Sequence, residues 1–208
     1  MVATNHETNG VSSDNLSLWK QVAETDPAFT KHVDMRGGYT AVDPHYQLLE
    51  ATKLWGPYGT SWGVCTCVWG IIPSTADVPK SSMTLDAQFF FPGGEFPVSA
   101  DMPYKHGDDC RKKLLTAVRS KALSLLGFSA DVFMGKFDDE QYISAVKTKF
   151  ADQDELKAKM LKSIRTAKSQ ATLDKCRERL ENLRGDGAIN KAMYDEGLEA
   201  IEQQQREI

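Results

Sequence analysis

Residues 105–142 read KHGDDCRKKLLTAVRSKALSLLGFSADVFMGKFDDEQY. Gly107 and Asp108 are start signals for a helix, and Gly127 stands where a residue in the left-handed conformation ends one. Between these signals, apolar residues recur at helical spacing on one side: Leu114, Leu115, Val118, Ala122, Leu125 and Leu126. The pattern predicts a long helix that packs an apolar stripe against the core.

The polar surface of this helix is basic, although the chain of 208 residues carries a formal net charge of −4. Its cations are Arg111, Lys112, Lys113, Arg119 and Lys121. A local positive surface on an acidic protein favours an anionic partner. A charge run taken alone also fits a merely solvated face, so the surrounding residues have to decide.

Length and composition indicate one globular domain with a small appendage. No apolar run is long enough to span a membrane, and the first residues lack the basic start and apolar core of a signal peptide. We therefore expect a cytosolic protein. Residues 1–14 are rich in Asn, Ser, Thr and Gly and are expected to form a flexible tail.

The elements before the basic helix predict an α+β domain. Helices are expected over Leu16–Ala23 and from the Asp43-Pro44 start to Gly56. Alternating or β-branched runs predict three strands, which are residues 62–72, 82–91 and 96–102. Together they indicate a three-stranded antiparallel meander with the basic helix packed on it, a β-β-β-α core, and Pro97 favours an edge position for the third strand.

Two short segments leave alternatives open. The pair Gly37-Gly38, between Arg36 and Tyr39, fits a simple turn, and it also lets backbone approach a phosphate. Cys65 and Cys67 are two residues apart in a strand, so we expect them on one face as small buried side chains, not as metal ligands.

Residues 151–208 are helical throughout and predict a helical hairpin module. Its apolar stripes are Leu156, Met160 and Ile164; Leu173, Cys176, Leu180 and Leu183; and Met193, Leu198 and Ile201. We place the boundary near Phe150, which gives a main domain over residues 15–150 and a C-terminal module over residues 151–208.

Two blocks resemble the single-strand annealing proteins of the Rad-fifty-two superfamily, especially the phage and prophage members grouped with Sak, RecT and Red-beta. The first block reads HYQLLEATKLWGPYGTSWG and contains Ala51, Gly56, Gly59 and Trp62. The second reads RKKLLTAVRSKALSLLGFSADVFMGKFDDEQY and contains Lys121-Ala122-Leu123 and Leu126-Gly127. The resemblance covers roughly residues 16–145.

The resemblance implies a homo-oligomeric ring or helical filament that binds single-stranded DNA in a basic groove and anneals complementary strands during recombination and repair. It implies no covalent chemistry and no cofactor, and the sequence has no G-x-x-x-x-G-K-[ST] phosphate loop. A bacterial host cytoplasm is the implied location. An exonuclease or a host single-strand binding protein is the implied partner of the C-terminal module.

Family site residues transfer only in part. The basic pair that the family carries on the long helix falls on Ser120 and Lys121, and a further arginine falls on Ser124. An arginine near the start of the short helix falls on Tyr46, which cannot pair with phosphate but could stack on a base. The positive charge that these positions lack is then expected from Arg111, Lys112, Arg119, Lys53 or Arg36. Lys113 on the long helix is a further candidate.

A single-strand binder also needs aromatic faces for bases. The candidates are Tyr39, Tyr46, Trp55, Tyr58 and Tyr104. Core packing is the stronger interpretation for Trp55, which occupies an apolar position of its helix. Tyr39 and Tyr58 stand beside glycines in predicted loops.

Two other functions remain open from the residues. The pairs Asp108-Asp109 and Asp138-Asp139 could hold Mg²⁺ in a metal-dependent nuclease, although both precede helices, where carboxylates are favourable in any case. Alternatively, the C-terminal module, with its acidic end from Glu196 to Ile208, is an interaction module that docks a replication or recombination protein.

Overall fold

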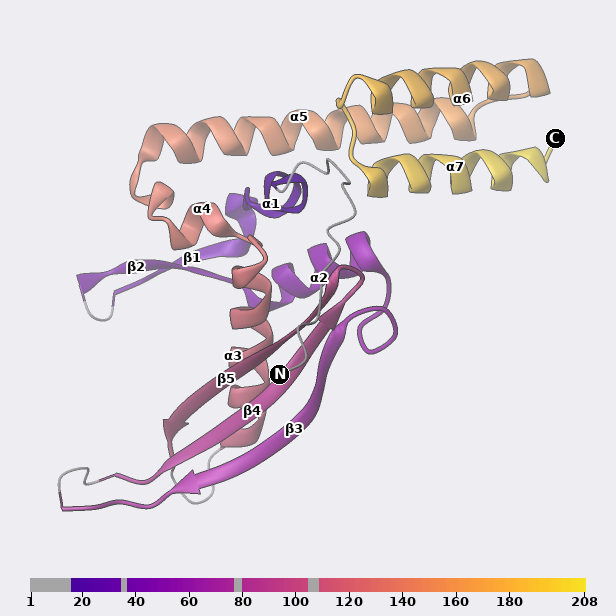
Figure 1. The fold of residues 1–208 in the computed structure, drawn as a ribbon. Helices are drawn as coiled ribbons and strands as arrows, with labels where there is room; N and C mark the ends of the chain where they lie inside the picture. Colours follow the sequence, from indigo (N-terminus) through magenta and orange to yellow (C-terminus); the bar gives the residue numbers. More distant parts are fainter. Residues whose placement is uncertain (1–15, 35–36, 77–79, 105–108) are drawn as a thin grey trace, which may run out of the picture.

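A three-stranded sheet with one long helix packed on it forms one end of the protein, and the three C-terminal helices lie at the other end (Figure 1). The structure is a computed structural model that describes residues 16–34, 37–76, 80–104 and 109–208. The predicted tail, Arg36, Gly107 and Asp108 lie outside the described residues.

The elements follow one another in the order that the sequence patterns predict, with a few additions. The helices are α1 (Ser17–Val22), α2 (Pro44–Trp55), α3 (Cys110–Leu125), α4 (Ala130–Phe133), α5 (Glu140–Arg165), α6 (Gln170–Gly185) and α7 (Lys191–Gln205). The strands are β1 (Thr30–Val33), β2 (Tyr39–Val42), β3 (Gly63–Ile72), β4 (Ser82–Phe91) and β5 (Gly94–Pro103). Single 3-10 turns cover Pro27–Phe29 and Lys136–Asp138.

The predicted meander is confirmed as an antiparallel sheet with the order β3-β4-β5. In β4 the alternation of the sequence becomes a difference between two faces, because Met83, Leu85, Ala87 and Phe89 are buried against α3. Pro97 lies in the outer strand β5, as predicted. On the outer side of this strand there is no partner strand among the described residues, so the missing N–H of proline costs no hydrogen bond there.

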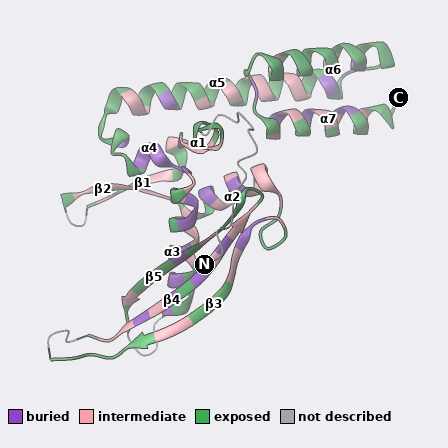
Figure 2. Ribbon diagram, in the orientation of Figure 1, coloured by how far each residue is buried: buried purple, intermediate pink, exposed green. Residues whose placement is uncertain are grey.

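Helix α3 is confirmed, but its contact stripe is narrower than predicted (Figure 2). The buried stripe follows an i, i+4 row through Leu114, Val118 and Ala122. Leu115 lies at the flank of this row and Leu125 beyond its end, and they are 40% and 59% exposed. The prediction that these two leucines belong to the core is therefore wrong.

Gly127 ends this helix with a φ of +97°, as the sequence predicts. A Cβ at this position would lie 2.7 Å from ring atoms of Trp19 in α1. Gly127 therefore combines the left-handed conformation with a close contact between the end of α3 and the N-terminal helix.

Replacing Gly127 with alanine should lower the free energy of unfolding by about 2 kcal/mol, because it adds left-handed strain and an overpacked contact with Trp19. Urea unfolding followed by tryptophan fluorescence measures the change. Gly185→Ala is the matched control, since a Cβ there meets nothing within 4 Å. Equal stability of Gly127→Ala and the wild type would contradict the role assigned to Gly127.

The prediction for the cysteine pair is wrong. A bulge interrupts the pairing of β3 with β4 between Cys65 and Val68, and Thr66 has a φ of +50°. The bulge breaks the alternation of side chains, so Cys67 is exposed and Cys65 only half-buried. All four cysteines of the chain are free thiols.

A second, two-stranded sheet is absent from the predictions. Strands β1 and β2 form an antiparallel hairpin in the segment that the sequence indicates only as a turn. Four-residue strands are too short for period-2 alternation to distinguish them from loop. The hairpin lies apart from the main sheet, beside α4 (Figure 1).

Both predicted ends of α2 are confirmed. The Asp43 carboxylate accepts a hydrogen bond from the His45 backbone N–H at 2.8 Å, and Pro44 occupies the first turn. Gly56 ends the helix with a φ of +93°. The start of α2 is thereby fixed close to the base of the β1–β2 hairpin, because Asp43 directly follows β2.

The C-terminal region is a group of three helices instead of the predicted hairpin. The second half of α5 packs with α6 and α7 around a core that contains Ile164, Leu173, Leu180 and Ile201. Helix α5 runs without a break through residue 150, so the boundary that the sequence predicts near Phe150 falls inside a helix. One helix thus belongs to both the main domain and the C-terminal module.

Among the helices of the described ranges, none combines the length and the apolar character that crossing a membrane requires.

Candidate nucleic-acid interface

The basic face of α3 consists of Arg111, Lys112, Lys113 and Arg119. These residues lie away from the buried stripe, and all but the half-buried Arg119 are exposed. The packing of α3 on the sheet holds their Cα atoms on one rigid element. Such a face presents several cations to a polyanion without the entropy loss of ordering a loop.

Two arginines of the basic face contact aromatic rings that come from other elements. The guanidinium of Arg111 lies over the ring of Trp69 in β3, 5.5 Å from its centre. The guanidinium of Arg119 lies 6.0 Å from the centre of the Tyr58 ring, in the connection between α2 and β3. Each pair places a cation beside a flat apolar surface, the combination that binds both parts of a nucleotide.

Tyr58 is held rigidly although its side chain is 44% exposed. Its hydroxyl accepts a hydrogen bond from the Val64 backbone N–H at 3.2 Å, and its ring packs edge-on against the buried Trp62. A fixed and accessible ring loses little freedom when a base stacks on it. The structure is thus compatible with the predicted role of Tyr58.

A hollow of about 460 Å³ lies along the outward side of α3. It is lined by Pro44, Asp109, Lys112, Lys113, Thr116, Ala117 and Ser120. Two neighbouring polar atoms, Arg119 Nε and Ser120 Oγ, are buried and have no hydrogen-bond partner among the described residues.

Lys121 differs from the other cations of the helix. Its Nζ donates to the Ser99 carbonyl of β5 at 3.0 Å. Lys121 therefore covers a carbonyl on the outer edge of the sheet, which limits edge-to-edge pairing at this point. The one cation that the resemblance carries over is thus partly committed to the fold.

The opposite face of the sheet is acidic. By register, Asp86, Glu95 and Asp101 share the face that points away from α3, and strands β3, β4 and β5 contain no lysine or arginine. A polyanion is repelled there and attracted to the side of α3. The fold therefore places the basic residues of α3 and the acidic residues of the sheet on different sides, which the net charge of the chain does not show.

Tyr46 does not offer the free face that the sequence suggests. It is 5% exposed, its ring stacks on Phe29 at 4.8 Å, and its hydroxyl accepts a hydrogen bond from the Asp26 backbone N–H at 3.2 Å. Burial first, and then the negative charge of Glu50, raise the pKa of the Tyr46 hydroxyl. Tyr46 is a core residue because its apolar ring fills the space between α2 and the segment before β1.

The raised pKa of Tyr46 predicts a loss of stability in alkali. The folded state holds this proton more tightly than the unfolded state does, so its contribution is complete below about pH 10 and is lost as the pH rises further. The free energy of unfolding should fall by up to about 1.4 kcal/mol between pH 10 and 11 through this group. Urea unfolding at both pH values should show a shallower fall in Tyr46→Phe, and equal falls would contradict the assignment.

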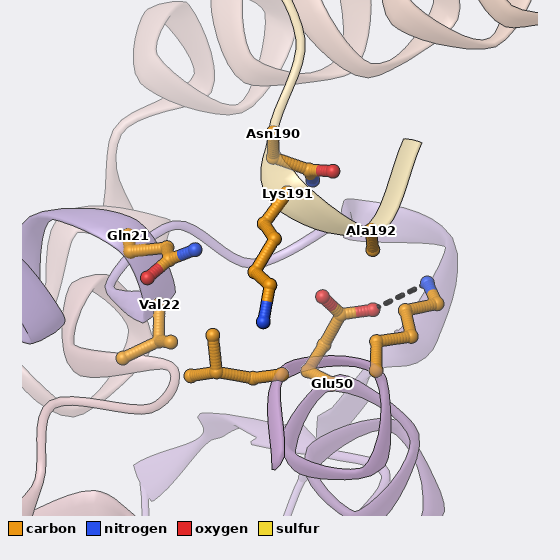
Figure 3. A pocket seen from close by; sticks show the side chains of 8 residues that line it. Gln21, Val22, Glu50, Asn190, Lys191 and Ala192 are labelled. Carbon is orange, nitrogen blue, oxygen red and sulfur yellow. Dashed lines mark hydrogen bonds and ion pairs between the residues drawn. The ribbon is translucent and has the colours of Figure 1, made fainter. Parts of the chain in front are cut away.

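Lys53 lies apart from the basic face. It pairs with Glu50 at 2.7 Å and lines a hollow between α1, α2 and the start of α7. Figure 3 shows Lys191 extending from α7 into this hollow toward α2. The prediction that Lys53 supplies charge to the groove therefore has no support in the fold, since Lys53 serves the contact between α2 and the C-terminal helices.

The remaining predicted aromatic residues divide between surface and core. Tyr39 is 48% exposed at the start of β2 and keeps an accessible ring. Trp55 contacts Trp62, Phe91 and Phe128, which confirms its core position. Tyr104 is half-buried against the same core. Arg36, the other predicted contact, lies outside the described residues.

The described carboxylates of the nuclease hypothesis, Asp109, Asp138 and Asp139, do not form one cluster, and Asp108 lies outside the described residues. Asp109 precedes α3 and Asp138 follows its far end, and a helix of 16 residues is about 24 Å long. The Asp139 carboxylate accepts a hydrogen bond from the Gln141 backbone N–H at 2.8 Å and caps α5. Within the described part of the chain, no three His, Cys, Asp or Glu side chains gather to hold a metal.

A buried carboxylate that the sequence patterns do not reveal connects three segments behind the site. Asp131, 2% exposed, accepts hydrogen bonds from the Thr25 backbone N–H at 2.8 Å and its hydroxyl at 2.6 Å. The Val132 backbone N–H and the Tyr142 hydroxyl also donate to it, at 2.8 and 3.0 Å. The network ties the segment after α1 to α4 and α5.

Sequence reasoning also missed two aromatic residues near the basic residues, Trp69 and Phe29. Trp69 belongs to an apolar strand and lies 42 positions before Arg111, so no spacing pattern connects them. Phe29 precedes a hairpin that was not predicted.

Comparisons with known protein families, curated proteins and solved structures find no match to this chain.

Proposed function

We propose that this chain binds single-stranded DNA and anneals complementary strands without ATP, during recombination or repair in a bacterial host cell. The observation that carries the proposal is the pairing of Arg111 with Trp69 and of Arg119 with Tyr58 along one basic face. A binder without sequence preference needs cations for the backbone and aromatic surfaces for the bases. An acidic opposite face directs the strand to this side.

Annealing further requires that a bound strand leaves its pairing edges accessible. Cations on a rigid helix hold phosphates, and the exposed ring of Tyr58 contacts a base through its flat face. Neither contact occupies the Watson–Crick edge of a base. Two strands held in this way are concentrated and aligned, which accelerates their pairing without covalent chemistry.

The proposal includes a homo-oligomer, either a ring or a filament. Strands β3 and β5 are the two outer strands of the sheet, and Val68, Ile71 and Ile72 along β3 are each more than half exposed. An outer strand with exposed apolar side chains is suited to contact another copy. Light scattering of the purified protein gives the number of subunits.

The deciding experiment is annealing of two complementary fluorescent oligonucleotides by the purified protein, in EDTA and without ATP. Pairing faster than in the protein-free control is the expected result. No acceleration, together with strands that shorten when Mg²⁺ is added, would replace annealing with the nuclease function.

A further inference from the structure

The β1–β2 hairpin carries a cation and an aromatic ring on one face. The register pairs Lys31 with Ala41 and Val33 with Tyr39, so Lys31 and Tyr39 are diagonal neighbours on the same side of the hairpin. Both side chains are exposed. The Lys31 side chain makes no hydrogen bond or ion pair with the described residues, so its ammonium group is available to a ligand.

A hollow of about 230 Å³ at the base of the hairpin continues this face. It is lined by Ala28, Phe29, Thr30, Lys31, Asp43 and Pro44. One side of the Phe29 ring stacks on the buried Tyr46, which fixes its position, while Phe29 itself remains 39% exposed. The Asp43 carboxylate in this hollow is engaged with the start of α2.

Pro44 lines this hollow and also the larger hollow along α3. Both hollows therefore border the start of α2. Their linings include Lys112, Lys113 and Ser120 on α3, and Phe29 and Lys31 at the hairpin. Lysines line both hollows, and Phe29 adds an aromatic ring on the hairpin side, so both hollows can contact a single strand.

We propose that the β1–β2 hairpin is a second contact surface for single-stranded DNA, in which Lys31 binds a phosphate and Tyr39 stacks on a base. The strand that lies on the basic face of α3 continues past Pro44 onto the hairpin. This inference rests on the proposed function and extends the site beyond α3. A short strand fills the α3 portion alone, whereas a longer strand needs both surfaces.

The test compares oligo-dT of about 4 and about 16 nucleotides, lengths that bracket the site sizes of single-strand binders. The variants are Lys31→Ala and Tyr39→Ala, and the binding of each is measured by fluorescence anisotropy over a range of salt concentrations. Lys175→Ala, an exposed lysine of α6, controls for the loss of one positive charge. Tyr39→Phe keeps the ring and controls for the loss of the hydroxyl.

On the long strand, Lys31→Ala should weaken binding about fivefold at 0.1 M salt and reduce the salt slope by about 0.7, the value for one single-strand phosphate contact. Tyr39→Ala should weaken it about tenfold, as the loss of one stacked base predicts. Tyr39→Phe and Lys175→Ala should bind like the wild type. None of the variants should change binding of the short strand.

Unchanged long-strand binding by both hairpin variants, with binding still dependent on Arg111 and Arg119, would overturn this inference and leave the proposed function standing. A wild-type protein that binds neither strand would overturn both. Circular dichroism spectra of the variants, compared with the wild type, verify that a loss of binding is not a loss of fold.

Discussion

Replacing Arg111 and Arg119 together with alanine should weaken binding of single-stranded DNA about 25-fold at 0.1 M salt. Each phosphate contact with a single strand contributes about 0.7 to the slope of log affinity against log salt concentration. Two lost contacts therefore lower the slope by about 1.4, which corresponds to the 25-fold change over a tenfold salt range below 1 M. Fluorescence anisotropy titrations at several salt concentrations measure both quantities.

The matched control removes the same charge elsewhere. Lys168 and Lys175 are exposed in and before α6, away from the basic face, so the double variant Lys168→Ala/Lys175→Ala has the same net charge. It should bind within about twofold of the wild type, because salt screens distant charges, so direct contacts with the DNA and not the overall charge determine the affinity. Equal losses in the two double variants would reduce the proposed site to a general charge effect.

The annealing assay gives the arginine variant a second readout. The rate of pairing of complementary strands should fall together with the affinity, since a strand that is not bound is not aligned. Full annealing activity despite the weaker binding would place the annealing surface elsewhere on the protein.

Replacing Asp131 with alanine should lower the free energy of unfolding by about 4 kcal/mol. The substitution leaves the donors of Thr25, Val132 and Tyr142 without their acceptor in a buried position, and removal of one member of such a network typically costs this much. Urea unfolding followed by circular dichroism measures the loss.

Asp152→Ala is the control for this substitution, because Asp152 is exposed on α5. It should change the free energy of unfolding by less than about 0.5 kcal/mol. Tyr142→Phe removes one donor and leaves the others paired, so it should destabilise much less than Asp131→Ala. A stability of Asp131→Ala equal to that of the wild type would mean that the network does not hold the three segments together.

Elements whose signals lie within one stretch of chain were predictable. Asp43-Pro44 and Gly56 delimit α2, Gly127 ends α3, and the alternation of Met83 to Phe89 defines β4. Each signal reports a local property, either a backbone conformation or the face on which a side chain lies. Helix-forming signals also placed Asp139 correctly as the cap of α5.

Local signals failed where the burial of a residue, or the start and end of an element, depends on the rest of the fold. Leu125 has the right angular position on α3 but lies past the end of the buried row, and the bulge at Thr66 breaks the alternation of β3. Helix α5 continues through Phe150 because nothing in its local sequence ends it. The turn at Gly37-Gly38 was visible, whereas the short strands on either side of it were not.

By itself the sequence determines that the chain is an α+β protein with a meander, a basic helix and a helical C-terminal region. Only the tertiary structure decides which side chains act together: Arg111 with Trp69, Arg119 with Tyr58, and Lys53 with Glu50 away from them. It also buries Tyr46 and exposes Tyr39. The physical reason is that periodicity describes one element at a time, while a binding surface depends on how separate elements pack against each other.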